Sequence, residues 1–159
     1  MVLFGIGFGL MPVVGYSKGA KLYGRLKESV FVALKVAVSI AVISSIILEI
    51  FAESIIALFS HDPALTAIAT PALRLYVSVL IFMAPTLIFV NMFMGLGKGT
   101  LAMLLLLFRD SVLLIPLLIL LSSWLGLWGV WLALPIANLI AFFVILFWAK
   151  KELRRFDVN

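Results

Sequence analysis

The sequence has no cysteine, one histidine and few charged residues. Without cysteine the chain forms no disulfide and offers no thiolate to a metal. The single histidine, His61, lies in a polar stretch with no second ligand beside it, so we expect no metal site. Charged residues make up 12% of the chain and hydrophobic residues 65%, whereas about a quarter of a soluble domain is charged. The composition excludes a soluble domain and indicates an integral membrane protein.

The sequence also lacks the patterns on which enzymes depend. It has no nucleophile with a base beside it, no paired carboxylates and no glycine loop with phosphate-binding spacing, so we expect neither an enzyme nor a cofactor. The net charge of +5 is not a sign of nucleic-acid binding, because the basic residues lie at the ends of hydrophobic runs, where anionic lipid attracts them. Membrane lipid is the expected partner, and nucleic acid is not.

Four hydrophobic runs have roughly the 20 residues that a helix needs to cross a hydrocarbon layer about 30 Å thick. They are residues 30–51, 72–94, 101–121 and 127–149. A shorter apolar segment, residues 1–17, precedes them, and we expect its glycines to break up its helix. We therefore predict an all-α integral membrane protein, a polytopic bundle of one partial helix, truncated at its start, and four transmembrane helices.

Nine of the twelve Lys and Arg residues fall into three groups that the hydrophobic runs place on one side of the membrane. Because Lys and Arg are retained in cytoplasmic loops, we predict a plasma-membrane protein with a cytoplasmic loop at residues 18–29 and a cytoplasmic tail at 150–159. Residues 1–17 would then start at membrane depth, where the first N–H groups of a helix lack partners. We expect the preceding part of the fold to be missing or supplied by another chain.

Three prolines lie inside the predicted transmembrane helices. Pro85, Pro116 and Pro135 each remove one backbone hydrogen bond and crowd the carbonyl four residues earlier, so we predict a kink at each. Such kinks occur where transporter helices line a cavity or bend, but proline is also common in ordinary membrane helices. The two interpretations are balanced for Pro85, and the ordinary one is favoured for the other two.

Polar residues at membrane depth are the candidates for a site. Arg109 and Asp110 lie near the middle of a run, where an unpaired charge costs about 3 kcal/mol or more. Neighbours on a helix point about 100° apart, so we expect the two not to pair with each other. Each contacts either a substrate or ion, or a neighbouring helix, and the second is slightly favoured for Arg109. Asn91 and Asn138 are expected to form hydrogen bonds between helices, with a cavity role as the alternative.

Five stretches of the chain, in the same order, resemble the multidrug and toxic compound extrusion (MATE) family. They are PVVGYSKGAKLYGRLKE at residues 12–28, ALFSHDPAL at 57–65, MGLGKG at 94–99, LFRDSVLLIPLL at 107–118 and GLWGVWLALPIANLIAF at 126–142. The resemblance covers essentially the whole chain and corresponds to the last third of the family's fold. It implies part of an antiporter that exports organic cations or amphipathic compounds by alternating access, in exchange for H⁺ or Na⁺.

Some relatives bind the coupling cation through an acidic residue that residues 75–94 of this chain lack. Coupling would then depend on the missing lobe or on Asp110. The residues expected to face a substrate cavity are Tyr76, Asn91, Arg109, Asp110 and Asn138. One alternative is a flippase for lipid-linked oligosaccharides of the same superfamily, which would need several cations in its cavity where only Arg109 is available. Another is a small structural membrane subunit, against which the glycines of the first segment argue.

Overall fold

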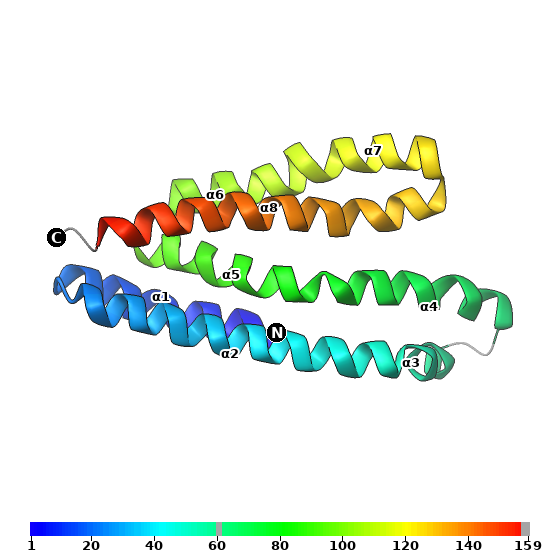
Figure 1. Cartoon of the computed structure of the whole chain (residues 1–159), viewed down its shortest axis with the longest axis horizontal. Coiled ribbons are helices and arrows are strands. Elements are labelled where there is room, and N and C mark those ends of the chain that lie inside the picture. Colours follow the sequence, from blue (N-terminus) through cyan, green and yellow to red (C-terminus); the bar gives the residue numbers. More distant parts are fainter. Residues whose placement is uncertain (60–61, 157–159) are drawn as a thin grey trace.

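The computed structural model describes residues 1–59 and 62–156, and almost all of them are helical (Figure 1). The helices are α1 (Val2–Gly19), α2 (Tyr23–Ile50), α3 (Ala52–Phe59), α4 (Pro63–Ser78), α5 (Leu80–Gly95), α6 (Gly99–Leu107), the π-helix η1 (Phe108–Leu113), α7 (Leu114–Leu125) and α8 (Leu127–Arg155). Within the described residues, five helical stretches are long and apolar enough to cross a membrane. The predicted all-α membrane bundle is confirmed.

Helix α5 lies at the centre of the bundle and packs against α1, α2 and α8 (Figure 1). In the stretch Leu65–Gly95, which α5 ends, 61% of the most apolar 18 residues are buried. In the stretch Gly99–Leu125, which joins α6, η1 and α7 into one span, the corresponding share is 6%. The bundle is therefore built around α5, and the span from α6 to α7 lies along its outside.

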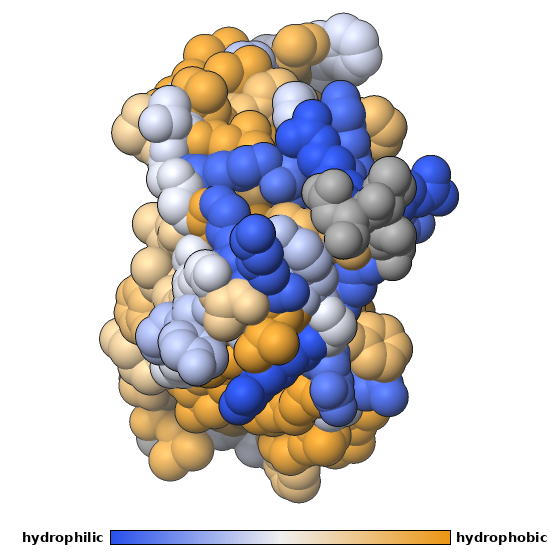
Figure 2. All heavy atoms as spheres, turned by 90° about the vertical axis from the view of Figure 1, so that its left-hand side faces the viewer, coloured by the Kyte–Doolittle hydropathy of each residue, from blue (hydrophilic) through white to orange (hydrophobic). Residues whose placement is uncertain are grey.

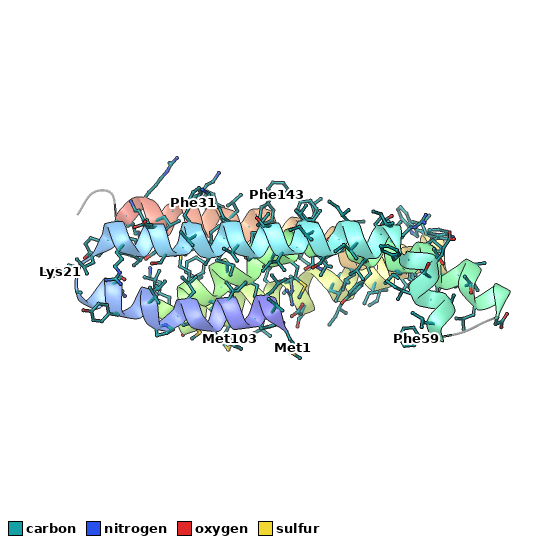
Figure 3. All side chains as sticks on the ribbon, turned by 90° about the horizontal axis from the view of Figure 1, so that it is seen from below. Met1, Lys21, Phe31, Phe59, Met103 and Phe143 are labelled. Carbon is teal, nitrogen blue, oxygen red and sulfur yellow. The ribbon has the colours of Figure 1, made fainter. Side chains whose placement is uncertain are left out.

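The three basic groups meet at one end of the bundle, where the α1–α2 turn, the α5–α6 turn and the end of α8 lie together (Figure 1). Hydrophilic side chains gather on this end face (Figure 2). We call it the basic end. Figure 3 shows Lys21 at this end, Phe59 at the opposite end and Met1 part-way between them.

The bundle is most tightly packed next to the basic end. Its largest fully buried side chains include Val14, Leu26, Met92, Phe93, Leu96 and Ile145. Polar contacts reinforce this core. The Lys18 ammonium donates to the Leu96 carbonyl at 2.7 Å, and Lys98 forms an ion pair with Glu152, which is only 8% exposed. These contacts join α1 to the end of α5, and the α5–α6 turn to α8.

Two predictions about the first part of the chain are wrong. The segment 18–29 is not a loop, because only residues 20–22 separate α1 from α2. Helix α2 starts early since Leu26 and Val30 are buried in the core. The glycines do not interrupt α1 either.

Glycines on both helices instead allow α1 to lie close to α5. A Cβ on Gly95 would lie 2.7 Å from the carbonyl oxygen of Met11, and one on Gly15 would lie 3.3 Å from the carbonyl oxygen of Gly95. Small residues permit such close approach between membrane helices, and the packing that results stabilises the helix despite its glycines.

The prolines lie at three different kinds of position. Pro85 is inside α5, but the break between α4 and α5 is at Val79, whose N–H bonds to the Tyr76 carbonyl at 3.2 Å. Pro116 is the third residue of α7, in the first turn after η1. Pro135 lies within α8, which continues through it as one helix. A bend of functional importance at these prolines stays a prediction.

At the end opposite the basic end, α3 is a separate short helix, and α4 begins at Pro63, a residue suited to the first position of a helix. Arg74 lies 3.6 Å from Glu49 and 3.8 Å from Glu53, linking α4 to α2 and α3. All three side chains are substantially exposed, so these pairs contribute little stability. His61, for which we expect no metal, lies outside the described residues.

Candidate functional site

Two adjacent cavities lie on either side of the Arg109–Asp110 pair. Cavity A, of about 120 Å³, is lined by Tyr76, Val79, Leu80, Met83, Arg109, Asp110, Leu114, Leu134, Ala137 and Asn138. Cavity B, of about 260 Å³, is lined by Phe4, Phe8, Met83, Thr86, Leu87, Val90, Asn91, Met94, Leu106, Arg109 and Asp110. All five polar residues predicted to face a cavity line at least one of the two cavities. Arg109, Asp110 and Met83 line both.

One stripe along α4 and α5 forms the wall that the cavities share. Its members are Tyr76, Leu80, Met83, Leu87, Asn91 and Met94. Their spacing of three or four residues is that of one helix face. The stripe continues across the break at Val79, so α4 and α5 act as one wall. Helical periodicity counted from Tyr76 would have found Met83, which the polar residues alone did not reveal.

Arg109 and Asp110 form a two-point ion pair, so the prediction that these neighbours do not pair is wrong. The Arg109 Nε donates to Asp110 Oδ1 at 2.7 Å, and Nη2 donates to Oδ2 at 3.0 Å. The Arg109 side chain is 20% exposed and that of Asp110 is 52% exposed. The predicted angle of about 100° applies to an α-helix, but the pair lies in the π-helix η1. A π-helix has a wider turn, with hydrogen bonds from i to i+5, so neighbouring side chains diverge less.

The π-helix has a local cause in the sequence. Pro116 has no N–H to donate and its ring crowds the carbonyl four residues before it. The turn before it is widened accordingly, and the Leu114 N–H bonds to the Arg109 carbonyl five residues back. Single π turns inside α-helices occur frequently at functional sites. Here the π turn holds the two charged residues between the cavities.

Asn91 and Asn138 do not form the predicted hydrogen bonds between helices. Asn91 Nδ2 donates to the Leu87 carbonyl at 2.8 Å, and Asn138 Nδ2 donates to the Leu134 carbonyl at 2.9 Å, each within its own helix. Both residues line a cavity, which agrees with the alternative interpretation. The Asn91 Oδ1 is buried without a hydrogen-bond partner among the described residues. A buried acceptor of this kind is available to a donor that enters the cavity.

The side of cavity B formed by α1 is aromatic. Phe4 and Phe8 line it, with ring centroids 6.3 Å apart. Gly7 lies on the same helix, and a Cβ there would be 2.5 Å from Asn91 Nδ2. The glycine therefore leaves room for Asn91 beside cavity B. Sequence reasoning missed these aromatic residues because it treated the first segment as an interrupted helix.

This arrangement places a carboxylate, a guanidinium, two amides and several aromatic rings around two cavities of an apolar bundle. A family model described as MatE matches residues 1–120 of the chain. The chain belongs to this family. The resemblance predicted from the sequence is confirmed, and the protein is a multi-pass membrane protein of the MATE multidrug transporter family, whose members are transporters.

Individual MATE proteins are similar to this chain in sequence and in fold. Multidrug export protein MepA of Staphylococcus haemolyticus (strain JCSC1435) is 29% identical over 162 residues, a match that covers 100% of this chain and 35% of MepA. Two solved structures of a multidrug resistance MATE family transporter of the MOP superfamily have the same fold at 23% identity. The inward-facing one has a TM-score of 0.92 and the outward-facing one 0.91.

Each solved structure matches 99% of this chain, and the chain covers 37% and 36% of their lengths, respectively. The chain thus spans about a third of the length of its relatives.

Proposed function

We propose that this chain is part of a cation-coupled multidrug efflux antiporter that exports organic cations or amphipathic compounds. The observation that carries the proposal is the position of Asp110 between two cavities that also contain aromatic side chains. A carboxylate and the faces of aromatic rings are the groups that attract an organic cation. Tyr76 supplies the ring in cavity A, and Phe4 and Phe8 supply the rings in cavity B.

The ion pair gives Asp110 two states with different affinities for a cation. Paired with Arg109, the carboxylate is already neutralised. An organic cation, Na⁺ or a proton competes with Arg109 for the same oxygens, so binding of one excludes another. Asp110 is the only acidic residue among those lining the two cavities in the described part of the chain. It is therefore our candidate for coupling H⁺ or Na⁺ entry to export, and the mechanism uses no cofactor.

Alternating access moves one part of a transporter against another around a site near the middle of the membrane. This chain is similar to an inward-facing and an outward-facing structure to nearly the same degree, with TM-scores of 0.92 and 0.91. That similarity supports a unit that moves as one body between the two states. The curated relative is about three times as long as this chain, and we propose that the other lobe is provided by the same polypeptide or by another chain.

The proposed orientation places the basic end and the C-terminus in the cytoplasm, with the protein in the plasma membrane. The end opposite the basic end carries the exposed acidic residues Glu49 and Glu53. The excess of Lys and Arg at the basic end supports this orientation, since such residues are retained on the cytoplasmic side.

Replacing Asp110 tests the proposal most simply. In the transporter that contains this sequence, we expect Asp110→Asn to lower ethidium efflux from cells at least tenfold, because the amide removes the charge that attracts the cation. The matched control is Glu53→Gln, which removes a carboxylate at the opposite end and should change efflux less than twofold. Equal export by the two variants would exclude Asp110 from the mechanism.

Arg109→Gln should change ethidium affinity in the opposite direction to Asp110→Asn. It removes the guanidinium that competes with the cation, so ethidium should bind more tightly to this variant in detergent and more weakly to Asp110→Asn. Fluorescence titration measures both affinities. A shift in the same direction for the two variants would contradict competition at Asp110.

The role of a second lobe is tested separately. An antibody against residues 150–159 should detect, in source-cell membranes, either a band several times heavier than 17.5 kDa or a 17.5 kDa band that co-purifies with a second membrane protein. Ethidium export by the 159-residue chain alone, reconstituted in vesicles, would contradict the need for another lobe.

A further inference from the structure

A separate groove opens at the basic end between α2 and α8, outside the two cavities. It has a volume of about 740 Å³. Its lining residues are Lys27, Glu28, Val30, Phe31, Leu34, Phe89, Leu146, Lys150, Leu153 and Arg154. Phe89 belongs to α5 and is 4% exposed, so it forms the floor of the groove. The walls come from two helices that are far apart in the sequence.

The groove is polar at one end and apolar along the rest of its length. On α2, Lys27 and Glu28 precede Phe31 and Leu34, and on the antiparallel α8, Lys150 and Arg154 follow Leu146. The charged residues of both helices therefore lie toward the basic end. Away from it, the exposed rings of Phe31 and Phe143 lie on one side of the molecule (Figure 3).

The charge at the polar end is positive. Three cations and one carboxylate line this part of the groove, and Lys150 and Arg154 are exposed residues on the same face of α8. The same two residues line a second hollow of about 580 Å³ with Phe147, Lys151 and Arg155. Arginine binds phosphate through two parallel N–H bonds and lysine binds it as a point charge, and these two residues lie one helical turn apart on α8.

Neighbouring contacts indicate that this end lies at the surface of the lipid. The Lys35 ammonium lies 4.6 Å from the centroid of the Phe31 ring, extended toward the basic end. The Lys151 ammonium lies 5.3 Å from the centroid of the Trp148 ring. A long cation directed toward the end of a membrane helix and a tryptophan near such an end are typical of the boundary between hydrocarbon and headgroups.

We propose that this groove binds an anionic phospholipid, with the phosphate held by Lys150 and Arg154 and an acyl chain lying against Phe31, Leu34 and Leu146. Basic pockets between transmembrane helices bind anionic headgroups, and the groove's apolar length suits the chain attached to one. The occupant is a lipid because charge and apolar surface follow each other along the membrane axis. The proposal depends on the protein's position in a membrane and not on transport.

Native mass spectrometry of the full chain in mild detergent tests the proposal. The probes are phosphatidylglycerol and phosphatidylcholine with identical acyl chains, added at equal concentrations. We expect phosphatidylglycerol to be retained at least fivefold more than phosphatidylcholine. The double variant Lys150→Gln/Arg154→Gln should retain at least fivefold less phosphatidylglycerol than the unmodified chain. Equal retention of the two lipids by the unmodified chain would overturn the proposal.

A matched control separates the groove from general charge. The double variant Lys21→Gln/Arg25→Gln also removes one lysine and one arginine charge at the basic end, but outside the groove. It should change phosphatidylglycerol retention less than twofold. Equal losses in the two double variants would show adsorption to any positive surface and overturn the proposal. Phe31→Ser should also reduce retention, and soluble glycerol phosphate should not displace the lipid. Displacement by glycerol phosphate would show that the headgroup alone is bound, and would overturn the role of the acyl chain.

Discussion

The basic end and the middle of the bundle use their polar residues in opposite ways. At the basic end, Glu152 is buried and pairs with Lys98, while Lys18 reaches the Leu96 carbonyl, so each contact joins helices that are distant in the sequence. In the middle, Arg109 pairs with its own neighbour and Asn91 with its own helix, beside cavities. These polar groups at the basic end thus hold helices together, whereas those that line the cavities remain available to a ligand.

The substitution with the largest expected effect on stability lies in the contact between α1 and α5. Gly95→Ala places a methyl group 2.7 Å from the Met11 carbonyl oxygen, and backbone cannot move aside without separating α1 from α5. We expect a loss of about 2 kcal/mol in the free energy of unfolding. Gly7→Ala should cost less, because it meets only the Asn91 side chain, which has cavity B beside it. Denaturation in mixed micelles, followed by circular dichroism, measures both.

The control for these variants is Gly9→Ala in α1, where no heavy atom outside the helix lies within 4 Å of the added methyl group. A glycine inside a helix is roughly 0.5–1 kcal/mol less favourable than alanine, so this variant should be slightly more stable. If Gly7→Ala and Gly95→Ala cost the same, packing would not differ between the two regions.

A charge substitution at the basic end should affect stability and leave transport intact. Glu152→Gln leaves the Lys98 ammonium without its carboxylate, and because the Lys98 side chain is 32% exposed we expect a smaller loss of about 1 kcal/mol. Efflux per folded molecule should remain within twofold of the unmodified protein. Asp110→Asn should show the reverse, with stability changed by less than about 1 kcal/mol since its side chain is 52% exposed.

Protein quantity by size-exclusion chromatography, combined with the efflux rate, separates the two effects. A lower efflux rate per folded molecule in Glu152→Gln would contradict a purely structural role for polar residues at the basic end.

The smallest effect concerns the turn between α1 and α2. Lys21 has a φ of 58°, a left-handed conformation that costs a non-glycine residue roughly 1 kcal/mol. Lys21→Gly should therefore stabilise the bundle by up to about 1 kcal/mol. Ala20→Gly is the control, because its φ of −80° gives glycine no advantage. Thermal unfolding of the two variants compares them directly, and equal melting temperatures would show that the left-handed turn is not a source of strain.

Much of the fold follows from the sequence because long apolar runs and their basic flanks are determined by the membrane. Helix bounds were less predictable, since α2 begins at Tyr23 through burial of Leu26, a tertiary effect. The continuous α1 was missed for a similar reason, because contact with α5 offsets the low helix propensity of its glycines.

Sequence reasoning named the polar residues that line the two cavities, but neither their geometry nor the apolar members of the lining. Tyr76, Asn91, Arg109, Asp110 and Asn138 all line the cavities, because polar residues inside membrane helices have few other places to lie. The Arg109–Asp110 pair depends on a π turn that an ideal α-helix does not contain. Phe4 and Phe8 carry no polar signal, so only the packing of α1 shows their place in cavity B.

The most direct test of the central claim, that the middle of the bundle is the substrate site, uses the absence of cysteine. Met83→Cys places a thiol on the wall of both cavities, and Leu22→Cys places one in the α1–α2 turn at the basic end. The measurement is the rate at which a cationic methanethiosulfonate modifies each thiol, with and without ethidium, in a transporter otherwise free of cysteine. If substrate binds in the cavities, ethidium should slow the modification of Met83→Cys at least fivefold and leave the rate for Leu22→Cys unchanged. Modification of Met83→Cys at the same rate with and without ethidium would contradict it.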